Sequence, residues 1–408
     1  MGLDRLELAL NRDLQAVQRN KTAKWPESII TRVKPPEGSK GPRYFLQGRG
    51  DQEFIRMNSN SYLGMSMHME VIRAEETAVQ EYGCGPGAVR FISGSLQLHR
   101  DLEQRLACFH DRDDAVLFSS AYMAMLGVLP PLVTERTIVL SDELNHNCII
   151  NAIRLCRPLA KKIYRHLDMA DLETKIQEAI GVASRAIIVT DGIFSMRGDC
   201  APLDRIGELS EKYDAQFAEN IVTVVDDSHG IGAFGDSGRG TEEYTGASGV
   251  DVLLGTLGKA FGVNGGYIVS SDTLVRYLRE TAPTYIYSNP ITPAEAAAAG
   301  RVLEIVDSAA GTLIAHLRGL THRLEQGFLD LGYETIQSAH PIVPLLVRDT
   351  QRTSELVNYL DQQGVLATGL NYPVVPKGDE TIRFQTNADQ TTEDIDSVLE
   401  ILDGTPIQ

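Results

Sequence analysis

Short apolar runs alternate with amphipathic stretches through the middle of the chain. Seven runs are apolar at nearly every position and have the length of buried strands, at residues 115–118, 137–140, 162–164, 186–190, 222–225, 252–254 and 267–269. Between them lie stretches with apolar side chains at helical spacing, such as residues 169–180 and 203–213. This alternation predicts an α/β fold whose mostly parallel, seven-stranded sheet is sandwiched between helices.

The two ends of the chain follow other patterns. Residues 3–18 carry a helix-like apolar stripe, and residues 19–43 are basic and rich in proline. The second segment is typical of an extended arm, which could be a solvated linker, a lid or an arm that embraces a second subunit. Past residue 290 the pattern predicts a smaller α+β domain, with helices at 293–308, 314–331 and 392–402 and strands at 343–347, 365–368 and 382–385. We therefore divide the chain into an N-terminal helix and arm (1–57), a large domain (58–290) and a C-terminal domain (291–408).

Composition and charge exclude several classes of function. The chain has 38 basic and 55 acidic residues, a formal charge of −17, which argues against nucleic acid or an anionic membrane as the main partner. The apolar runs fall short of the roughly 20 residues of a membrane span, and the acidic N-terminus is not typical of a signal peptide. Five cysteines without a C-x-x-C spacing favour reduced thiols and a cytoplasmic protein.

Reactive side chains follow two of the predicted strands. Asp226, Asp227 and His229 come directly after residues 222–225, and Lys259 follows residues 252–254 in a glycine-flanked loop. Ligands of open α/β sheets bind outside the carboxyl ends of strands. A buried lysine amine can form an imine with an aldehyde, and a carboxylate can pair with a protonated ring nitrogen. The pattern predicts pyridoxal 5'-phosphate (PLP), tethered by Lys259 and with its ring nitrogen on Asp226.

Two further segments suit the same cofactor. His146 follows the strand at 137–140 and could stack on the face of the ring, although a structural cap is the alternative. Residues 119–122 open a helix after the strand at 115–118, so the free backbone N–H groups there could hold a phosphate.

Two other interpretations of these segments are weaker. Residues 230–235 fit the dinucleotide fingerprint G-x-G-x-x-G, but that motif needs a helix to begin within it, and turn-forming residues follow instead. Asp226, Asp227 and His229 could be metal ligands, but further ligands at suitable spacing are not apparent, so we expect no metal site.

These segments together resemble the α-oxoamine synthases of the fold-type I PLP superfamily, from about residue 58 to residue 402. The most specific parts of the resemblance are residues 60–64, 141–146, 190–196, 226–229 and 255–260. Residues 90–94, 287–289 and 372–378 are more similar to the branch that makes 2-amino-3-ketobutyrate than to the 8-amino-7-oxononanoate, 5-aminolevulinate or serine palmitoyl branches. Departures from the family pattern at residues 124–125 and 390–391 bear on the acyl donor more than on the class of reaction.

The resemblance implies a role for each site residue. Lys259 would form the covalent bond and shuttle protons, Asp226 would pair with the ring nitrogen and His146 would stack on the ring. His229 and Ser195 would approach the ring hydroxyl, and Arg383 would bind the amino-acid carboxylate with Asn60 nearby. The groups that would hold the phosphate are Ala121, Tyr122 and Thr256, with Ser288 and Asn289 from a second subunit. Sharing of the site implies an obligate homodimer.

The implied reaction joins a small amino acid, with glycine favoured, to an acyl-CoA. The products would be CoA and an α-amino ketone or 2-amino-3-oxo acid, with or without loss of CO₂. Three alternatives stay open at this point: another specificity within the family, a fold-type I aminotransferase or lyase, and a non-catalytic homologue that uses the fold only for binding.

Overall fold

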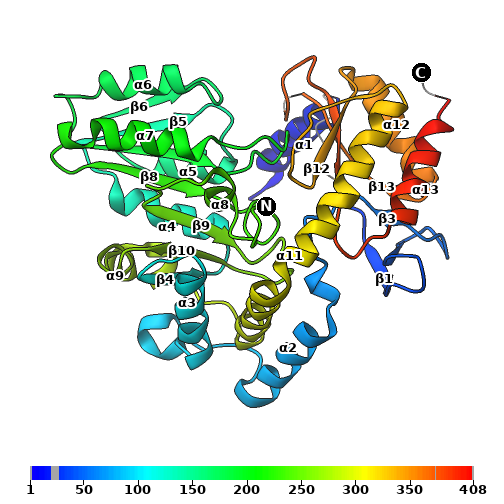
Figure 1. The fold of residues 1–408 in the computed structure, drawn as a ribbon, viewed down its shortest axis with the longest axis horizontal. Helices are drawn as coiled ribbons and strands as arrows, with labels where there is room; N and C mark the ends of the chain where they lie inside the picture. Colours follow the sequence, from blue (N-terminus) through cyan, green and yellow to red (C-terminus); the bar gives the residue numbers. More distant parts are fainter. Residues whose placement is uncertain (1, 20–26, 373, 407–408) are drawn as a thin grey trace.

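The computed structural model describes residues 2–19, 27–372 and 374–406. Residues 20–26 of the predicted arm and Pro373 of the segment 372–378 lie outside the described residues. A seven-stranded sheet forms the centre of the larger lobe in the order β4-β10-β9-β8-β7-β5-β6 (Figure 1). Its strands are β4 (Asp114–Phe118), β5 (Thr137–Asp142), β6 (Ala160–Tyr164), β7 (Arg185–Asp191), β8 (Ile221–Asp226), β9 (Val252–Thr256) and β10 (Gly266–Ser270).

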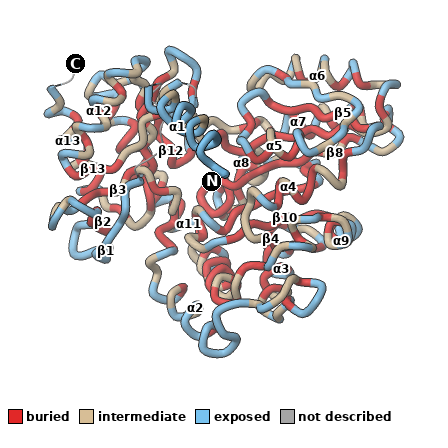
Figure 2. The backbone as a smooth tube through the Cα atoms, turned by 180° about the vertical axis from the view of Figure 1, so that it is seen from behind, coloured by how far each residue is buried: buried red, intermediate tan, exposed pale blue. Residues whose placement is uncertain are grey.

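The seven predicted strands are confirmed, and their continuous apolar runs have a physical reason. Successive side chains of a strand point to opposite faces, and both faces of this sheet are buried. In β4, Ala115 and Leu117 enter one hydrophobic core, whereas Val116 and Phe118 enter the other. The tube coloured by burial accordingly shows the strands of the sheet as largely buried (Figure 2).

Helices cover both faces, as the alternating pattern predicts. One face packs against α4 (Ala121–Leu132), α5 (Asn147–Leu155), α9 (Asp272–Thr281) and α10 (Pro283–Ile286). The other face packs against α2 (Met69–Tyr82), α3 (Gln97–Phe109), α6 (Met169–Gln177), α7 (Leu203–Tyr213) and part of α11 (Pro293–Asp330). The short α8 (Thr241–Thr245) follows the loop after β8.

Six of the seven strands run in the same direction: β9, β8, β7, β5 and β6 pair parallel as neighbours, and β4 shares their direction on the far side of β10. Only β10 departs from this direction among the seven, because it pairs antiparallel with both β9 and β4. The sheet is thus mostly parallel, as predicted. The carboxyl ends of β5, β7, β8 and β9 consequently meet at one edge of the sheet.

The C-terminal part forms a second lobe around an antiparallel sheet of order β11-β12-β15-β14. Its strands are β11 (Glu334–Thr335), β12 (Ile342–Leu346), β14 (Thr368–Leu370) and β15 (Thr381–Gln385), and α12 (Thr350–Gln362) and α13 (Thr392–Asp403) pack on them. A separate parallel pair joins β13 (Val365–Leu366) to β3 (Ile55–Arg56). The predicted small α+β unit is therefore present.

The prediction of two helices at 293–308 and 314–331 is wrong, because α11 is one helix of 38 residues. Residues 309–313 are Ala-Ala-Gly-Thr-Leu, and an isolated glycine such as Gly311 is tolerated inside a helix. The helix starts with a capping box in which Thr292 and Glu295 satisfy each other's backbone N–H groups. Val302 packs in the core under the large sheet, whereas Leu324 packs in the core of the second lobe, so α11 belongs to both.

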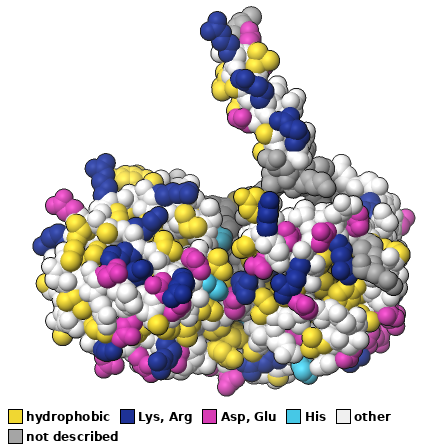
Figure 3. Space-filling view, turned by 90° about the horizontal axis from the view of Figure 1, so that it is seen from above, with side chains coloured by type: hydrophobic (Ala, Val, Ile, Leu, Met, Phe, Trp, Pro, Cys, Tyr) yellow, Lys and Arg dark blue, Asp and Glu magenta, His cyan; other side chains and the backbone are white. Residues whose placement is uncertain are grey.

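The N-terminal segment is only partly extended. Strands β1 (Ile30–Lys34) and β2 (Arg43–Leu46) form an antiparallel pair, and Arg43 Nη2 binds Asp394 Oδ1 of α13 at 2.6 Å. Helix α1 (Asp4–Arg19) has no buried residue, and Figure 3 shows it projecting from the body of the molecule. The large apolar side chains of the predicted stripe, which begins one residue before the helix, are exposed: Leu3, Leu6, Leu8, Leu10, Leu14 and Val17.

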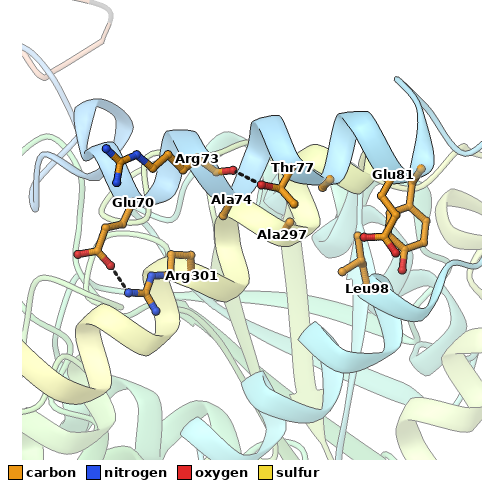
Figure 4. Close-up of a pocket in the computed structure, with 10 residues that line it drawn as sticks. Glu70, Arg73, Ala74, Thr77, Glu81, Leu98, Ala297 and Arg301 are labelled. Carbon is orange, nitrogen blue, oxygen red and sulfur yellow. Dashed lines mark hydrogen bonds and ion pairs between the residues drawn. The ribbon is translucent and has the colours of Figure 1, made fainter.

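A shallow hollow lies between α2 and α11 on the outside of the large lobe. Figure 4 shows Glu70 of α2 paired with Arg301 of α11 at one end of it. Glu81 and Leu98 line the other end. This hollow is remote from the strand ends that carry the predicted chemistry. Among the described residues, no helix is long and apolar enough to cross a membrane.

Candidate active site

The carboxyl ends of neighbouring strands bring together the side chains predicted from the sequence. Asp191 ends β7 and Asp226 ends β8. Asp226 is paired in register with Asp191 on one side and with Leu254 of β9 on the other. His146 follows β5 in the tight turn 143–146, and Lys259 follows β9. These side chains belong to four strand ends that are distant in the sequence, and the register of the sheet places the strands side by side.

Lys259 lies in a compact loop between β9 and β10. The loop is closed by Leu257 N, which donates to Gly265 O at 3.0 Å, and by Gly262 N, which donates to the carbonyl of Lys259 at 2.9 Å. Burial lowers the pKa of the Lys259 amine to about 8, although the negative charges of Asp226 and Asp191 oppose this shift. At pH 7 roughly a tenth of the amine is therefore unprotonated and nucleophilic, far more than for an exposed lysine.

Asp226 is buried and held on both oxygens. Its Oδ1 accepts from Ser228 N at 3.1 Å, and its Oδ2 accepts from the thiol of Cys148 at 3.3 Å. Burial, together with the charge of Asp226, raises the pKa of that thiol, so Cys148 stays protonated and acts as a donor. The carboxylate is thereby fixed in one orientation at the end of β8.

A second carboxylate, Asp191, supports the turn that carries His146. Its Oδ2 accepts from His146 N at 2.7 Å, and its own N–H donates to Asn145 Oδ1 at 2.9 Å. Burial, reinforced by the charge of Asp226, raises the pKa of Asp191 well above its ordinary value.

His146 caps α5 through its ring. Its Nδ1 accepts from Cys148 N at 3.3 Å and lies 3.0 Å from Cys148 Sγ, and its ring centroid lies 6.5 Å from that of Tyr122. Burial lowers the pKa of His146, which favours the neutral ring. The capping role considered for this residue is therefore real, and stacking of the ring on a ligand stays a prediction.

The first turn of α4 is the candidate anion cradle. Ser120 is the N-cap, and its hydroxyl accepts from Met123 N at 3.2 Å. The backbone N–H groups of Ala121 and Tyr122 belong to the first turn, where no intrahelical acceptor exists. Gly266 of β10 is paired in register with Phe118 of β4 on one side and with Thr256 of β9 on the other. Thr256 therefore lies across β10 from the end of β4, where α4 begins.

Gly266 is required for this close approach. A Cβ at Gly266 would fall 2.2 Å from the backbone nitrogen of Ala121, so only glycine lets α4 begin directly against β10. The predicted phosphate-binding groups Ala121, Tyr122 and Thr256 are consequently brought together at one edge of the site.

Arg383 reaches the site from β15 of the second lobe. Its Nη1 donates to the carbonyl of Ser195 at 2.8 Å, and burial lowers its pKa. Asn60 contacts the same strand, since its Oδ1 accepts from Gln385 Nε2, two residues beyond Arg383 on the same side of β15. The structure thus places the two predicted substrate-binding residues next to each other.

His229 is fixed by two neighbours. Its Nδ1 lies 2.7 Å from the hydroxyl of Tyr62, and its carbonyl accepts from His340 Nε2 at 2.9 Å. Burial, together with the nearby Lys259 charge, lowers the pKa of His229 well below its ordinary value, so the ring is neutral. His229 and Ser195 both lie at the rim where β8 and the loop after β7 meet the second lobe.

Ser288 and Asn289 lie apart from these groups, after α10. Asn289 is exposed, and the Ser288 hydroxyl donates to the carbonyl of Asn289 at 3.5 Å. The prediction that they reach the site of a second subunit remains a prediction.

Sequence reasoning missed Cys148, Asp191 and Tyr62 as parts of the site. Asp191 ends a predicted strand beside Asp226, so its position was a usable signal. Cys148 and Tyr62 gave no such signal, because their contacts depend on how a helix and a distant loop pack. Asp227, by contrast, is structural: its carboxylate accepts from Thr241 N at 2.6 Å and from Thr241 Oγ1 at 2.5 Å.

The residues 230–240 that follow Asp227 form turns, and no helix begins within the glycine motif 230–235. The exclusion of a dinucleotide site there is consistent with this geometry.

Comparison with known proteins decides the family. Residues 52–402 match the family of class I and II aminotransferases. The chain is 41% identical to the mitochondrial 2-amino-3-ketobutyrate coenzyme A ligase of Homo sapiens, over 98% of this chain and 92% of the relative. It is 37% identical to 8-amino-7-oxononanoate synthase of Thermosipho melanesiensis, over 92% of this chain and 93% of the relative. The chain belongs to the α-oxoamine synthases.

Solved structures of other α-oxoamine synthases have the same fold. The serine palmitoyltransferase of Sphingomonas wittichii superposes with a TM-score of 0.88 at 26% identity, over 99% of this chain and 97% of the other. That of S. paucimobilis, in complex with PLP and myriocin, superposes with a TM-score of 0.87 at 23% identity, over 99% and 98% of the two chains. The predicted family, its fold-type I architecture and PLP as the cofactor of that family are confirmed.

The side chains of this α-oxoamine synthase fit that cofactor. The cradle of α4 suits a phosphate, the fixed carboxylate of Asp226 suits a protonated ring nitrogen, and Lys259 supplies an amine of lowered pKa. Within the described residues, Ser228 Oγ and Arg383 Nε are buried without a hydrogen-bond partner. Such orphaned donors are costly in a folded protein, and a bound ligand at these strand ends would satisfy them.

Proposed function

We propose that this α-oxoamine synthase condenses a small amino acid, with glycine favoured, with an acyl-CoA. The observation that carries the proposal is Arg383, a half-buried side chain whose Nε is buried without a hydrogen-bond partner among the described residues. It lies at the rim of the strand ends that carry Lys259. A guanidinium in this position suits the carboxylate of an amino acid by a bidentate pair. An enzyme that binds an amino acid next to a reactive lysine is the simplest account of both groups.

A cavity beside Ser195 supports an acyl group as the second substrate. It has a volume of about 340 Å³ and lies between the hairpin 193–200 and the second lobe. Most of its lining is apolar, including Phe194, Met196, Leu346 and Val375. Because the carbonyl of Ser195 accepts from Arg383, the cavity adjoins the proposed amino-acid site.

Separate residues of this chain would hold the cofactor and the substrate. PLP bound here would supply an electron sink for the negative charge that develops on the Cα atom of the amino acid. Asp226 would hold the ring nitrogen, the first turn of α4 with Thr256 would hold the phosphate, and His146 would cover one face of the ring.

Lys259 would be the base, because its amine has a pKa near 8 and so can accept a proton at neutral pH. The Cα–H proton moves to its Nζ, and the Cα electron pair forms a bond to the acyl carbon. The carbon–sulfur bond of the thioester breaks, and CoA leaves as a thiolate that takes up a proton. The product keeps its carboxylate as a 2-amino-3-oxo acid or loses CO₂ as an α-amino ketone.

The homodimer and the location of the protein belong to the same proposal. Large apolar side chains lie exposed on residues 90–94 and 287–289 near the predicted shared groups, notably Phe91, Ile92 and Tyr287. A second copy would bury these side chains, and its Ser288 and Asn289 would then complete the site. The five cysteines, all free, support a reducing compartment such as the cytoplasm.

The test is release of free CoA thiol by the purified, PLP-loaded protein, with glycine, alanine or serine crossed with acyl-CoAs of increasing chain length. We expect release only when both substrates are present, with glycine and a short acyl chain giving the highest kcat/KM. Pyruvate or ammonia released without any acyl-CoA would instead indicate an aminotransferase or lyase.

A second specificity has its own support. The apolar lining of the cavity and the 37% identity to an 8-amino-7-oxononanoate synthase favour a longer aliphatic acyl group with alanine. In the same assay, a kcat/KM that increases with chain length and prefers alanine would select this candidate over the first.

A further inference from the structure

A cluster of charged side chains outside the proposed site links two of the loops that build it. The ring of His166, which follows β6, lies between two carboxylates: its Nδ1 is 2.9 Å from Asp142 Oδ1 and its Nε2 is 3.2 Å from Asp199 Oδ2. The ring also packs edge-on against Phe194, with the centroids 4.4 Å apart. Since an ionised carboxylate only accepts hydrogen bonds, both contacts are satisfied together only by an imidazolium with two N–H donors.

The first carboxylate belongs to the strand that positions His146. Asp142 ends β5, and its oxygens also accept from Leu144 N at 2.9 Å and from Leu167 N at 3.0 Å. Leu167 has a φ of 55°, a left-handed conformation that a leucine rarely adopts. Such a residue persists only where its surroundings over-determine it, which indicates that the contacts of Asp142 and His166 fix this turn firmly.

The second carboxylate belongs to the hairpin that carries Ser195. The hairpin is closed by Phe194 N, which donates to Asp199 O at 3.0 Å, and by Arg197 Nε, which donates to Asp199 Oδ2 at 2.8 Å. The carbonyl of Ser195 near its tip accepts from Arg383. A continuous set of contacts therefore runs from His166 through Asp199 and Ser195 to the guanidinium of Arg383.

The electrostatics of the cluster favour the charged ring. Burial alone would lower the pKa of His166, but its hydrogen bonds to Asp142 and Asp199 and their charges overcome that effect and raise the pKa to about 9. The other charged groups around the ring are Glu143, whose Oε1 accepts from His166 N at 2.8 Å, Arg197 on the hairpin, and Arg165 on its own segment, which pairs with Asp168 and Asp171.

We propose that His166 is a positioning residue that, as an imidazolium, locks the Ser195 hairpin to the end of β5 and thereby sets the guanidinium of Arg383 for the substrate carboxylate. The inference rests on the proposed function, in which Arg383 binds an amino acid. His166 itself touches neither substrate nor cofactor, so it acts through Asp142 and Asp199.

The experiment compares amino-acid binding by the PLP-loaded wild type with that of His166→Asn, Asp199→Asn and a control, His322→Asn. His322 is exposed on α11, away from the cluster. The dissociation constants of glycine, alanine and serine are measured between pH 6.5 and 10 from the change in cofactor absorbance, without acyl-CoA.

We expect His166→Asn to weaken binding about tenfold at pH 7, the lower range for loss of a supporting partner behind a binding group. The ratio of variant to wild-type dissociation constants should fall toward one above pH 9, where the wild-type ring also becomes neutral. Titration of the ligand's own amino group cancels in this ratio. His322→Asn should match the wild type throughout.

Asp199→Asn is the second test variant. It keeps an acceptor oxygen for His166 but removes one charge, which lowers the pKa of the ring. At pH 6.5 the affinity of this variant for the amino acid should equal that of the wild type. As the pH rises, its affinity should decrease at a lower pH than that of the wild type, because the ring loses its proton earlier. This variant keeps the shape of the Asp199 side chain, so it also carries the test if His166→Asn does not fold.

A readout without any ligand separates this proposal from the proposed function. In urea unfolding of the cofactor-free protein, a ring whose folded pKa is raised stabilises the fold fully below its unfolded pKa of about 6.5 and loses that effect as pH rises through about 9. The urea concentration at the unfolding midpoint should thus be higher for the wild type than for His166→Asn at pH 6, and this difference should be lost at pH 10. A difference that is independent of pH in both measurements would overturn the proposal, whereas absence of CoA release from the wild type would overturn only the proposed function.

Discussion

At the scale of single residues, the chemistry depends on how burial alters a few charged groups. Lys259 is the clearest case, because its amine combines a pKa near 8 with two carboxylates, Asp226 and Asp191, at the neighbouring strand ends. A surface lysine lacks this combination. Lys212, for example, is exposed and paired with Glu173, and its pKa is raised by that contact.

Lys259→Ala should lower CoA release by about 10³-fold or more, because one group supplies both the covalent attachment and the proton transfer. The variant should also lack the absorbance of the lysine-bound cofactor. Lys212→Ala is the matched control and should keep both properties. Normal turnover by Lys259→Ala would show that another group is the base.

Arg383→Lys tests the proposed recognition of the carboxylate. A lysine keeps the charge but loses the planar pair of donors, so KM for the amino acid should rise about tenfold to a hundredfold. KM for the acyl-CoA should change little. The control is Arg323→Lys, since Arg323 pairs with Asp396 on the exposed face of α11. Equal increases in both KM values would point to general damage to the site.

At the scale of elements, the proposed phosphate cradle depends on how closely α4 approaches β10. The helix begins at Ala121, shortly after β4 ends at Phe118, and a Cβ at Gly266 of β10 would collide with its first residue. The helix start therefore depends on a neighbouring strand as well as on its own N-cap, Ser120.

Gly266→Ala should displace the start of α4 and weaken PLP binding about tenfold or more, with an overpacking cost of about 1–3 kcal/mol. Equilibrium titration of the cofactor and urea unfolding measure the two effects. Gly311→Ala is the control: it lies in α11 with no atom within 4 Å of a new Cβ, and it should stabilise by about 0.5–1 kcal/mol. Unchanged PLP affinity in Gly266→Ala would exclude the cradle as the phosphate site.

Much at this scale followed from the sequence alone. The seven strands were predictable because burial on both faces demands continuous apolar runs, and the meeting of Asp226, His146 and Lys259 followed from parallel neighbours. The antiparallel direction of β10 and the unbroken helix α11 were not predictable, since neither changes the local pattern. The contact of Cys148 with Asp226 and the bridge made by His166 depend on loop geometry, which apolar periodicity does not encode.

At the scale of the whole molecule, one chain presents surfaces that suit a second copy. Helix α1 has no buried residue, and Phe91, Ile92 and Tyr287 are large apolar side chains exposed by at least 66%. Exposed apolar area of this kind marks interaction surfaces more often than free surface. The proposed homodimer would cover it while delivering Ser288 and Asn289.

Subunit complementation tests the shared site. A mixture of Lys259→Ala chains with chains that carry both Ser288→Ala and Asn289→Ala should form hybrid dimers in which one of the two sites has a complete set of residues. Activity should therefore return after unfolding and refolding the two inactive variants together, and light scattering should give about twice 44.7 kDa. Activity of the serine–asparagine variant at the wild-type level would refute sharing.

The continuity of α11 constrains how this chain could be divided. Its first turns, with Val302 and Val306, close the core beneath the large sheet, while Leu320 and Leu324 belong to the second lobe. A fragment that stopped at residue 290 would keep every strand of the large sheet and yet leave a wide apolar face without its cover. The sheet and its cofactor site are therefore not a separable module, and truncation or domain exchange in this protein should use breakpoints outside the span of that helix.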